Sequence, residues 1–106
     1  MINSQKIIDA IKSQGMLEII FNKESDGSIS VKNVAPYDIY PKSDKNGLTR
    51  DVLLGYAESD RQKEAHTIII YLDNINKVTE LNRFFDGNRI RFLIKAKKQP
   101  YVPRNW

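Results

Sequence analysis

Short segments in which apolar and polar residues alternate run through most of this sequence, and turn-forming residues separate them. Alternation with a period of two is typical of β-strands that bury one face. The intervening loops are rich in Asp, Asn, Ser and Gly, which favour tight turns. The pattern predicts strands at Leu17–Asn22, Ser28–Val34, Val52–Ala57 and Thr67–Leu72.

For two of these strands, the sequence also predicts which faces are buried. In the second strand, Ile29 and Val31 are predicted to face the core, while Ser28, Ser30 and Lys32 face solvent. Apolar residues fill consecutive positions of the third strand, which is therefore predicted to be buried on both faces. Gly55 within it predicts a bulge or a close approach of another backbone, because glycine otherwise weakens a strand.

Two prolines, Pro36 and Pro41, bracket the segment Tyr37–Tyr40. Proline has no N–H group to donate to a strand ladder, so it is disfavoured within a central strand. The segment is therefore predicted to be an edge or bent strand at which the sheet turns a barrel corner.

Helical spacing occurs twice. Isoleucines at positions 7, 8 and 11 follow Ser4, a good N-cap residue, which predicts a helix that ends at Gly15. A second helix is predicted to start at Asp73 or Asn74 and to end before Gly87. Its apolar stripe is spaced by three, three and four residues and consists of Ile75, Val78, Leu81 and Phe85. Beyond it, alternation of Ile90, Phe92 and Ile94 with Arg89, Arg91 and Leu93 predicts a last strand.

These elements predict an α+β fold: a small, strongly curved antiparallel sheet or an SH3/Sm-like β-barrel, with an N-terminal helix and a C-terminal helix. With 106 residues, of which 41% are hydrophobic and 28% charged, the chain has the size and composition of one globular domain. The domain is predicted to span residues 1–95, and residues 96–106 are predicted to form a basic and aromatic tail. One core is predicted to contain Ile19, Leu54, Ile68, Ile70 and Val78.

The positive charge of the chain is confined to its last quarter. Residues 1–82 contain ten basic and twelve acidic side chains, whereas residues 83–106 contain seven basic side chains and only Asp86 as an acid. Basic groups neutralise phosphates and aromatic rings stack on unpaired bases, so this mixture suits single-stranded nucleic acid. The alternative is a solvated basic surface, with Tyr101 and Trp106 folded back onto the barrel. The candidate residues for nucleic-acid or anion binding are Arg83, Arg89, Arg91, Lys95, Lys97, Lys98, Tyr101, Arg104 and Trp106.

The residues that most enzymes and metal sites require are scarce. The chain has no cysteine and one histidine, His66, and no serine lies in a nucleophile motif, so it is not predicted to be an enzyme. His66 is expected to be a partly exposed residue at the end of a loop. Neither a metal-ligand spacing nor a glycine-rich phosphate loop occurs, so no metal or cofactor is predicted. The residues predicted to lie in turns and caps are Asp38, Asp51, Asp60 and Asp73.

A family resemblance rests on three segments, Ile29–Ile39, Asp51–Tyr56 and Ile70–Ile75, followed by Phe85. Over about residues 5–87 the chain resembles the WYL domain of bacterial transcription regulators and defence-associated proteins. The resemblance implies an Sm/SH3-like β-barrel that senses nucleic acid or a nucleotide-like ligand. The triplet that names the family aligns with residues 51–53, where only the leucine is kept, so the chain resembles a divergent member. The family's ligand-contacting arginines have no counterpart here.

The sequence therefore predicts a non-enzymatic regulatory or sensing module that binds single-stranded nucleic acid or a nucleotide-like anionic ligand. The alternative is a protein-interaction or assembly module that engages a protein partner or a second copy through an exposed strand edge or the aromatic tail. No apolar run is long enough to cross a membrane and no signal-peptide pattern begins the chain, so a cytoplasmic location without a membrane partner is expected.

Overall fold

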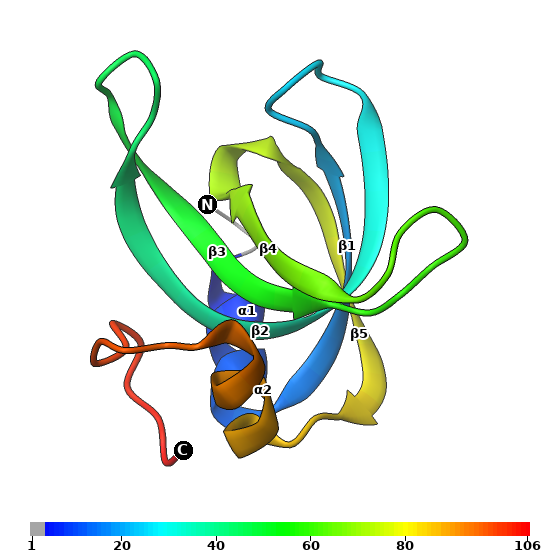
Figure 1. The fold of residues 1–106 in the computed structure, drawn as a ribbon, viewed down its shortest axis with the longest axis vertical. Coiled ribbons are helices and arrows are strands. Elements are labelled where there is room, and N and C mark those ends of the chain that lie inside the picture. The colour runs from blue at the N-terminus through cyan, green and yellow to red at the C-terminus, as the bar shows by residue number, and fades with distance from the viewer. Residues whose placement is uncertain (1–3) are drawn as a thin grey trace.

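The protein forms one curved sheet with two helices (Figure 1), and the computed structural model describes residues 4–106. Five antiparallel strands lie in the order β4-β3-β2-β1-β5. Across residues 4–106 no ladder joins β4 to β5, so the sheet stays open. The predicted α+β class and curved antiparallel sheet are confirmed. The elements are α1 (Ser4–Ser13), β1 (Gly15–Asn22), β2 (Ile29–Ser43), β3 (Thr49–Ala57), β4 (His66–Tyr71), the 3₁₀ helix η1 (Leu72–Asn74), β5 (Ile75–Phe84) and α2 (Gly87–Ile94).

The long strand β2 produces the bend of the sheet. It pairs with β1 only through residues 29–34 and with β3 only through residues 34–43, so its second half is locally an edge. Pro36 and Pro41 lie in that half, where the strand has one neighbour only, as the prolines predicted. A register shift between Pro36 and Asp38 marks the bend.

Gly55 of β3 lies opposite Pro36 at this bend. A Cβ atom added to Gly55 would lie 2.6 Å from Val34 Cγ1 and 2.8 Å from the carbonyl oxygen of Ala35. Both distances are too short for a side chain, which confirms the predicted close approach of another backbone. The bend therefore depends on a glycine in β3 as well as on the prolines in β2.

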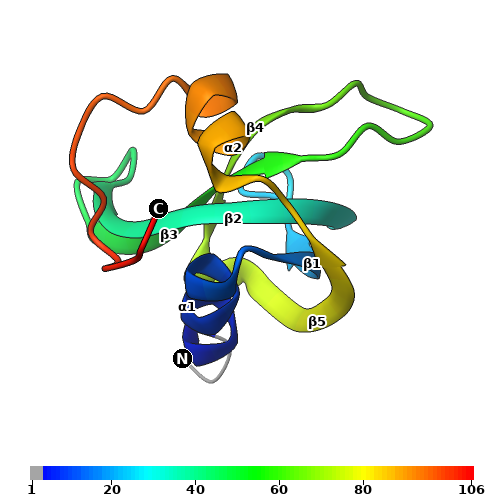
Figure 2. The same cartoon turned by 90° about the horizontal axis from the view of Figure 1, so that it is seen from below.

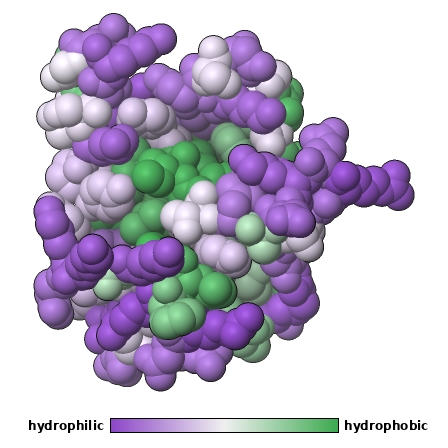
Figure 3. All heavy atoms as spheres, viewed as in Figure 1, coloured by the Kyte–Doolittle hydropathy of each residue, from purple (hydrophilic) through white to green (hydrophobic). Residues whose placement is uncertain are grey.

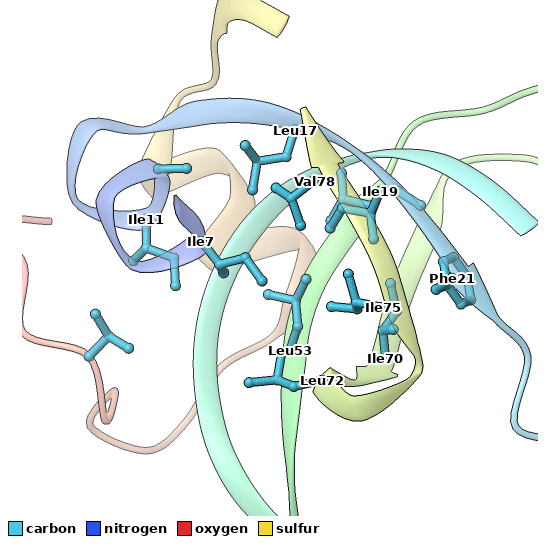
Figure 4. Packing of buried hydrophobic residues seen from close by; sticks show 14 residues of the cluster. Ile7, Ile11, Leu17, Ile19, Phe21, Leu53, Ile70, Leu72, Ile75 and Val78 are labelled. Carbon is cyan, nitrogen blue, oxygen red and sulfur yellow. The ribbon is translucent and has the colours of Figure 1, made fainter. Parts of the chain in front are cut away.

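The helices cover opposite sides of β2 (Figure 2). Beneath the sheet, Ile7 and Ile11 of α1 are fully buried and pack against β1, β3 and β5 (Figure 4). Of the predicted core residues, Ile19, Ile70 and Val78 belong to this cluster, and Ile68 packs against its border. Leu54 was wrongly placed in the same core, because it lies in a second cluster with residues of α2.

Two predicted elements are wrong, because residues 75–84 form a strand and residues 87–94 form a helix. Phe21 and Ile19 of β1 pair with Ile75 and Val78 of β5, so β5 has one extra residue in this interval. This bulge puts Ile75 and Val78 on the same face at a spacing of three, which imitates a helix.

Helix α2 begins at the N-cap residue Asp86, which the alternating pattern of residues 89–94 did not indicate. The side chain of Asp86 accepts hydrogen bonds from the backbone nitrogens of Asn88 and Arg89 at 3.0 and 3.4 Å. Ile90 is buried on the inner side of α2, whereas Phe92 is 79% exposed. Residues 87–94 therefore follow the helical period, and the alternation of apolar and basic residues has no structural role.

The face assigned to the start of β2 is also wrong. Ile29 and Val31 are 68% and 50% exposed, whereas Ser30 and Lys32 are half-buried. Pairing with β1 decides this, because Ser30 lies opposite the buried Phe21 and must share its face. The strand register thus overrides the hydrophobic pattern.

Replacing Ile70 with alanine should lower the free energy of unfolding by about 2–5 kcal/mol, because a buried aliphatic side chain is removed from the core. The neighbouring Ile69 is 44% exposed and provides a matched control, for which alanine should cost less than about 1 kcal/mol. Urea denaturation measures both values. Equal losses in the two variants would contradict the assignment of faces in β4.

Candidate functional site

Residues 96–106 follow α2 and fold back toward β2 and α1, and this segment is named the strap (Figure 2). Its attachment centres on Asp38, which is 5% exposed in the bent half of β2. The Asp38 carboxylate accepts hydrogen bonds from the backbone nitrogens of Tyr101 at 3.0 Å and Val102 at 2.9 Å. Val102 is itself buried in the core beneath the sheet. The prediction that Asp38 lies in a turn or cap is therefore wrong.

Trp106 forms the second attachment of the strap. Its indole Nε1 donates a hydrogen bond of 2.8 Å to the carbonyl oxygen of Ile11 in α1. Its ring packs edge-on against Tyr37 and Phe85, with centroid distances of 5.7 and 5.5 Å. Gly87 makes room for it, because a Cβ atom there would lie 2.5 Å from Trp106 Cδ2. Trp106 is thus folded back onto the domain, as the alternative interpretation of the tail predicted.

Arg104 lies between these two attachments, and its side chain is only 2% exposed. The guanidinium carbon is 4.7 Å from the ring centre of Tyr37 and 4.5 Å from that of Trp106. Its Nε donates to the Val102 carbonyl oxygen at 3.1 Å, and its Nη2 donates to Asp38 at 3.3 Å. The remaining nitrogen, Nη1, is buried and has no hydrogen-bond partner within residues 4–106.

A cavity of about 480 Å³ lies between α2, β2 and the strap. Arg91 of α2 also lines it, and Arg91 Nε is a second buried nitrogen without a hydrogen-bond partner among the described residues. Aspartate and glutamate are absent from its lining. The side chains that matter chemically are Tyr37, Arg91, Lys97, Lys98, Arg104 and Trp106.

The electrostatics of this cavity favour an anion. Burial lowers the pKa of Arg104, the nearby Arg91 cation lowers it further, and Asp38 opposes both effects. Two guanidinium groups therefore repel each other across a partly desolvated space, and each has an unused donor. An anion bound in the cavity would offset this repulsion.

The other candidate residues lie outside this cavity. Arg83 forms a two-pronged ion pair with Glu58, with distances of 2.8 and 2.9 Å, and this contact raises the pKa of Arg83. Arg89 lines a separate cavity with Arg83, and Lys95 is the exposed left-handed residue that ends α2. The structure therefore brings together Arg91, Lys97, Lys98, Arg104 and Trp106 of the nine candidates.

Tyr101 borders a neighbouring cavity of about 380 Å³. It stacks on Tyr40, with a centroid distance of 6.0 Å, and remains 65% exposed. Lys97 and Lys98 line both cavities, so the basic and the aromatic parts of the candidate site share one wall. Tyr101 thus keeps an accessible ring beside the basic cavity.

Sequence reasoning missed Asp38, Tyr37 and Gly87 as parts of the site. Asp38 is the one acidic residue in the largely apolar segment from Val34 to Tyr40, and this isolation was the available signal. A carboxylate inside an apolar strand needs donors from elsewhere in the fold. For Gly87 no signal was present, because its neighbour Trp106 is distant in sequence.

Other predicted chemistry can be located briefly. His66 begins β4, is partly exposed as expected, and its Nδ1 lies 2.8 Å from the carbonyl oxygen of Glu64. Within the described part of the chain, no group of three or more His, Cys, Asp or Glu residues is arranged to hold a metal ion. Neither helix among residues 4–106 has the length and apolar character required to span a membrane.

Hydrophobic residues are also present on the surface. On the face seen in Figure 3, they gather over the sheet and over α2, with hydrophilic residues around them. The exposed apolar side chains include Ile69 of β4, Phe84 at the end of β5, and Phe92 of α2, with exposed fractions of 44%, 74% and 79%. Such side chains provide apolar contact area outside the basic cavity.

Comparison with known proteins returns no match to a protein-family model, to a curated protein or to a solved structure. The geometry of the cavity is therefore the basis for assigning a function.

Replacing Gly87 with alanine should displace Trp106, because the added methyl group would overlap the indole ring. Trp106 is the only tryptophan, so its fluorescence emission should shift to longer wavelength as the ring becomes hydrated. Gly15 provides a control, because its Cβ would meet no atom closer than 3.5 Å and alanine there should leave the emission unchanged. An unshifted spectrum in the Gly87→Ala variant would argue against the docked strap.

Proposed function

We propose that this protein is a non-enzymatic regulatory or sensing module that binds a phosphate-bearing anion, either single-stranded nucleic acid or a nucleotide-like ligand. The binding site is the cavity between α2 and the strap. The observation that carries this proposal is that Arg91 and Arg104, which line the same cavity, each have a buried side-chain nitrogen without a hydrogen-bond partner within residues 4–106. Leaving a buried donor unsatisfied is costly, and a bound anion removes that cost.

Charge and size support the same ligand class. Asp38 pairs with Arg104, so Arg91, Lys97 and Lys98 remain as uncompensated cations of the lining. A volume of about 480 Å³ lies within the range of small-molecule sites in proteins. The accessible ring of Tyr101 offers a stacking surface for a base beside the phosphate position.

The proposal includes a WYL-like, SH3/Sm-like barrel as the scaffold. The three segments that resemble the WYL domain fall in β2, in β3 and in the region from β4 to the start of β5. The bent β2 and the tight crossing at Gly55 supply the strong curvature that such a barrel requires. The basic cavity, however, is built from α2 and the strap, which lie beyond the segment of resemblance.

A second candidate function is protein interaction or assembly with a partner or a second copy. The exposed Ile69, Phe84 and Phe92 favour it, because large apolar side chains on a surface are typical of binding patches. Both β4 and β5 are edge strands, to which another strand can add. Hydrophobic docking and strand addition depend weakly on salt, whereas phosphate binding depends on it steeply.

Replacing Arg91 with glutamine should weaken binding of a short, 5′-phosphorylated, single-stranded oligonucleotide about tenfold or more at low salt, because a charged donor is removed. Arg89→Gln removes the same charge from α2 but lies outside the cavity, so it should change affinity by less than about twofold. Isothermal titration calorimetry measures both affinities. Similar losses in both variants would mean that general charge, rather than the cavity, binds the ligand.

Replacing both Lys97 and Lys98 with glutamine should flatten the dependence of log affinity on log salt concentration by roughly 0.7 for each phosphate that the variant no longer neutralises. The fold should persist, because both side chains are exposed. Oligonucleotide titrations at several salt concentrations, with circular dichroism as the folding control, provide the measurement. Absence of oligonucleotide binding by the unmodified protein at low salt would reject the proposal and favour the interaction module.

A further inference from the structure

The cavity lining includes two arginines, each with a buried side-chain nitrogen that lacks a hydrogen-bond partner within residues 4–106. Arg91 belongs to α2, and Arg104 belongs to the strap. Nε and Nη2 of Arg104 donate to the Val102 carbonyl and to Asp38, and Nη1 has no hydrogen-bond partner within residues 4–106. Donor groups on two walls of a cavity suit a tetrahedral group, whose oxygens point in several directions.

The charge of the cavity suits a doubly charged group. After Asp38 has neutralised Arg104, the cations Arg91, Lys97 and Lys98 remain, and the lining contains no aspartate or glutamate. A phosphomonoester carries close to two negative charges at neutral pH, whereas an internal phosphodiester carries one. Coulombic attraction to the three remaining cations is therefore greater for the monoester.

The burial of the donors restricts how a phosphate reaches them. Arg91 Nε and Arg104 Nη1 have almost no accessible surface, so a ligand oxygen meets them only where neighbouring side chains move aside and the oxygen projects beyond the rest of the ligand. A terminal phosphate presents three free oxygens at the end of a molecule. An internal phosphodiester presents two, and a sugar on each side holds it away from the walls.

We infer that the cavity recognises a terminal phosphate group, a phosphomonoester, in preference to the internal phosphodiesters of a continuous strand. This inference rests on the proposed function and specifies its ligand. The shared chemistry has two sources: a mononucleotide, or the phosphorylated end of a nucleic-acid strand.

The inference gives binding a defined pH dependence. The second proton of a phosphomonoester leaves with a pKa of about 6, so the dianion rises about tenfold in abundance between pH 5 and pH 7. The charged and titratable groups that line the cavity are Tyr37 of β2, Arg91 of α2, and Lys97, Lys98 and Arg104 of the strap, and Asp38 pairs with Arg104 outside the lining. His66, the only histidine, is not part of the lining.

The test compares four probes by isothermal titration calorimetry on the full chain at low salt: adenosine monophosphate, a short oligonucleotide with a 5′-phosphate, the same oligonucleotide without it, and sulfate. The two phosphomonoesters should bind about tenfold more tightly at pH 7 than at pH 5. Sulfate is a dianion at both pH values, so its affinity should stay constant and report any titration of the protein. Arg91→Gln should weaken binding at pH 7 and reduce the pH dependence, whereas Arg89→Gln should change neither.

The outcomes separate the inference from the proposed function. Preference for the phosphorylated oligonucleotide over its unphosphorylated form, with the pH dependence, supports the inference, and comparison with the mononucleotide then identifies the source. Equal affinity for both oligonucleotides, abolished in Arg91→Gln, would overturn the inference while the proposed function stands. Absence of binding by all four probes would overturn both.

Discussion

The buried carboxylate of Asp38 organises the part of the molecule that carries the candidate site. It sits at the bend of β2, accepts two backbone hydrogen bonds from the strap and pairs with Arg104. A buried carboxylate is strongly unfavourable without such partners, so bend and strap stabilise each other. Without this attachment, the strap wall of the cavity would lose its fixed position against α2, and Arg91 and Arg104 would no longer face one space.

The strap reconciles two interpretations that the sequence left as alternatives. Trp106 folds back onto the domain and is held by Ile11 and by the space above Gly87. Lys97 and Lys98 lie on the same segment but remain exposed at the cavity. One stretch of chain therefore closes a hydrophobic cluster and also presents basic groups. Lys97 and Lys98 stay exposed, whereas Val102, Arg104 and Trp106 pack against the rest of the domain.

The arginines of this cavity have hydrogen-bond donors that no acceptor within residues 4–106 meets, and this distinguishes the cavity from an ordinary charged surface. The pair formed by Arg83 and Glu58 is exposed and satisfied, so it has little capacity for a further anion. Arg104, by contrast, is desolvated and only partly satisfied, and Arg91 is its like-charged neighbour. Buried donors without acceptors are rare in native proteins, and each one requires a structural or functional explanation. The proposed binding of an anion in this cavity offers one explanation for both donors.

Local patterns in the sequence determined part of the fold, and partners far apart along the chain decided the rest. Side-chain periodicity predicted helix α1 and located the first four strands. The backbone sterics of proline predicted that the chain around Pro36 lies at an edge. The concentration of basic residues after position 82 likewise located the region of the site. However, pairing with β1 introduces a bulge into β5, and the bulge gives the apolar residues of this strand a helix-like spacing. Asp38 and Arg104, which pair in the structure, are 66 residues apart in the sequence. Periodicity reports only which face of a segment is apolar. Which donors share a cavity depends on strand register and on where the strap docks, and neither is encoded in any local pattern.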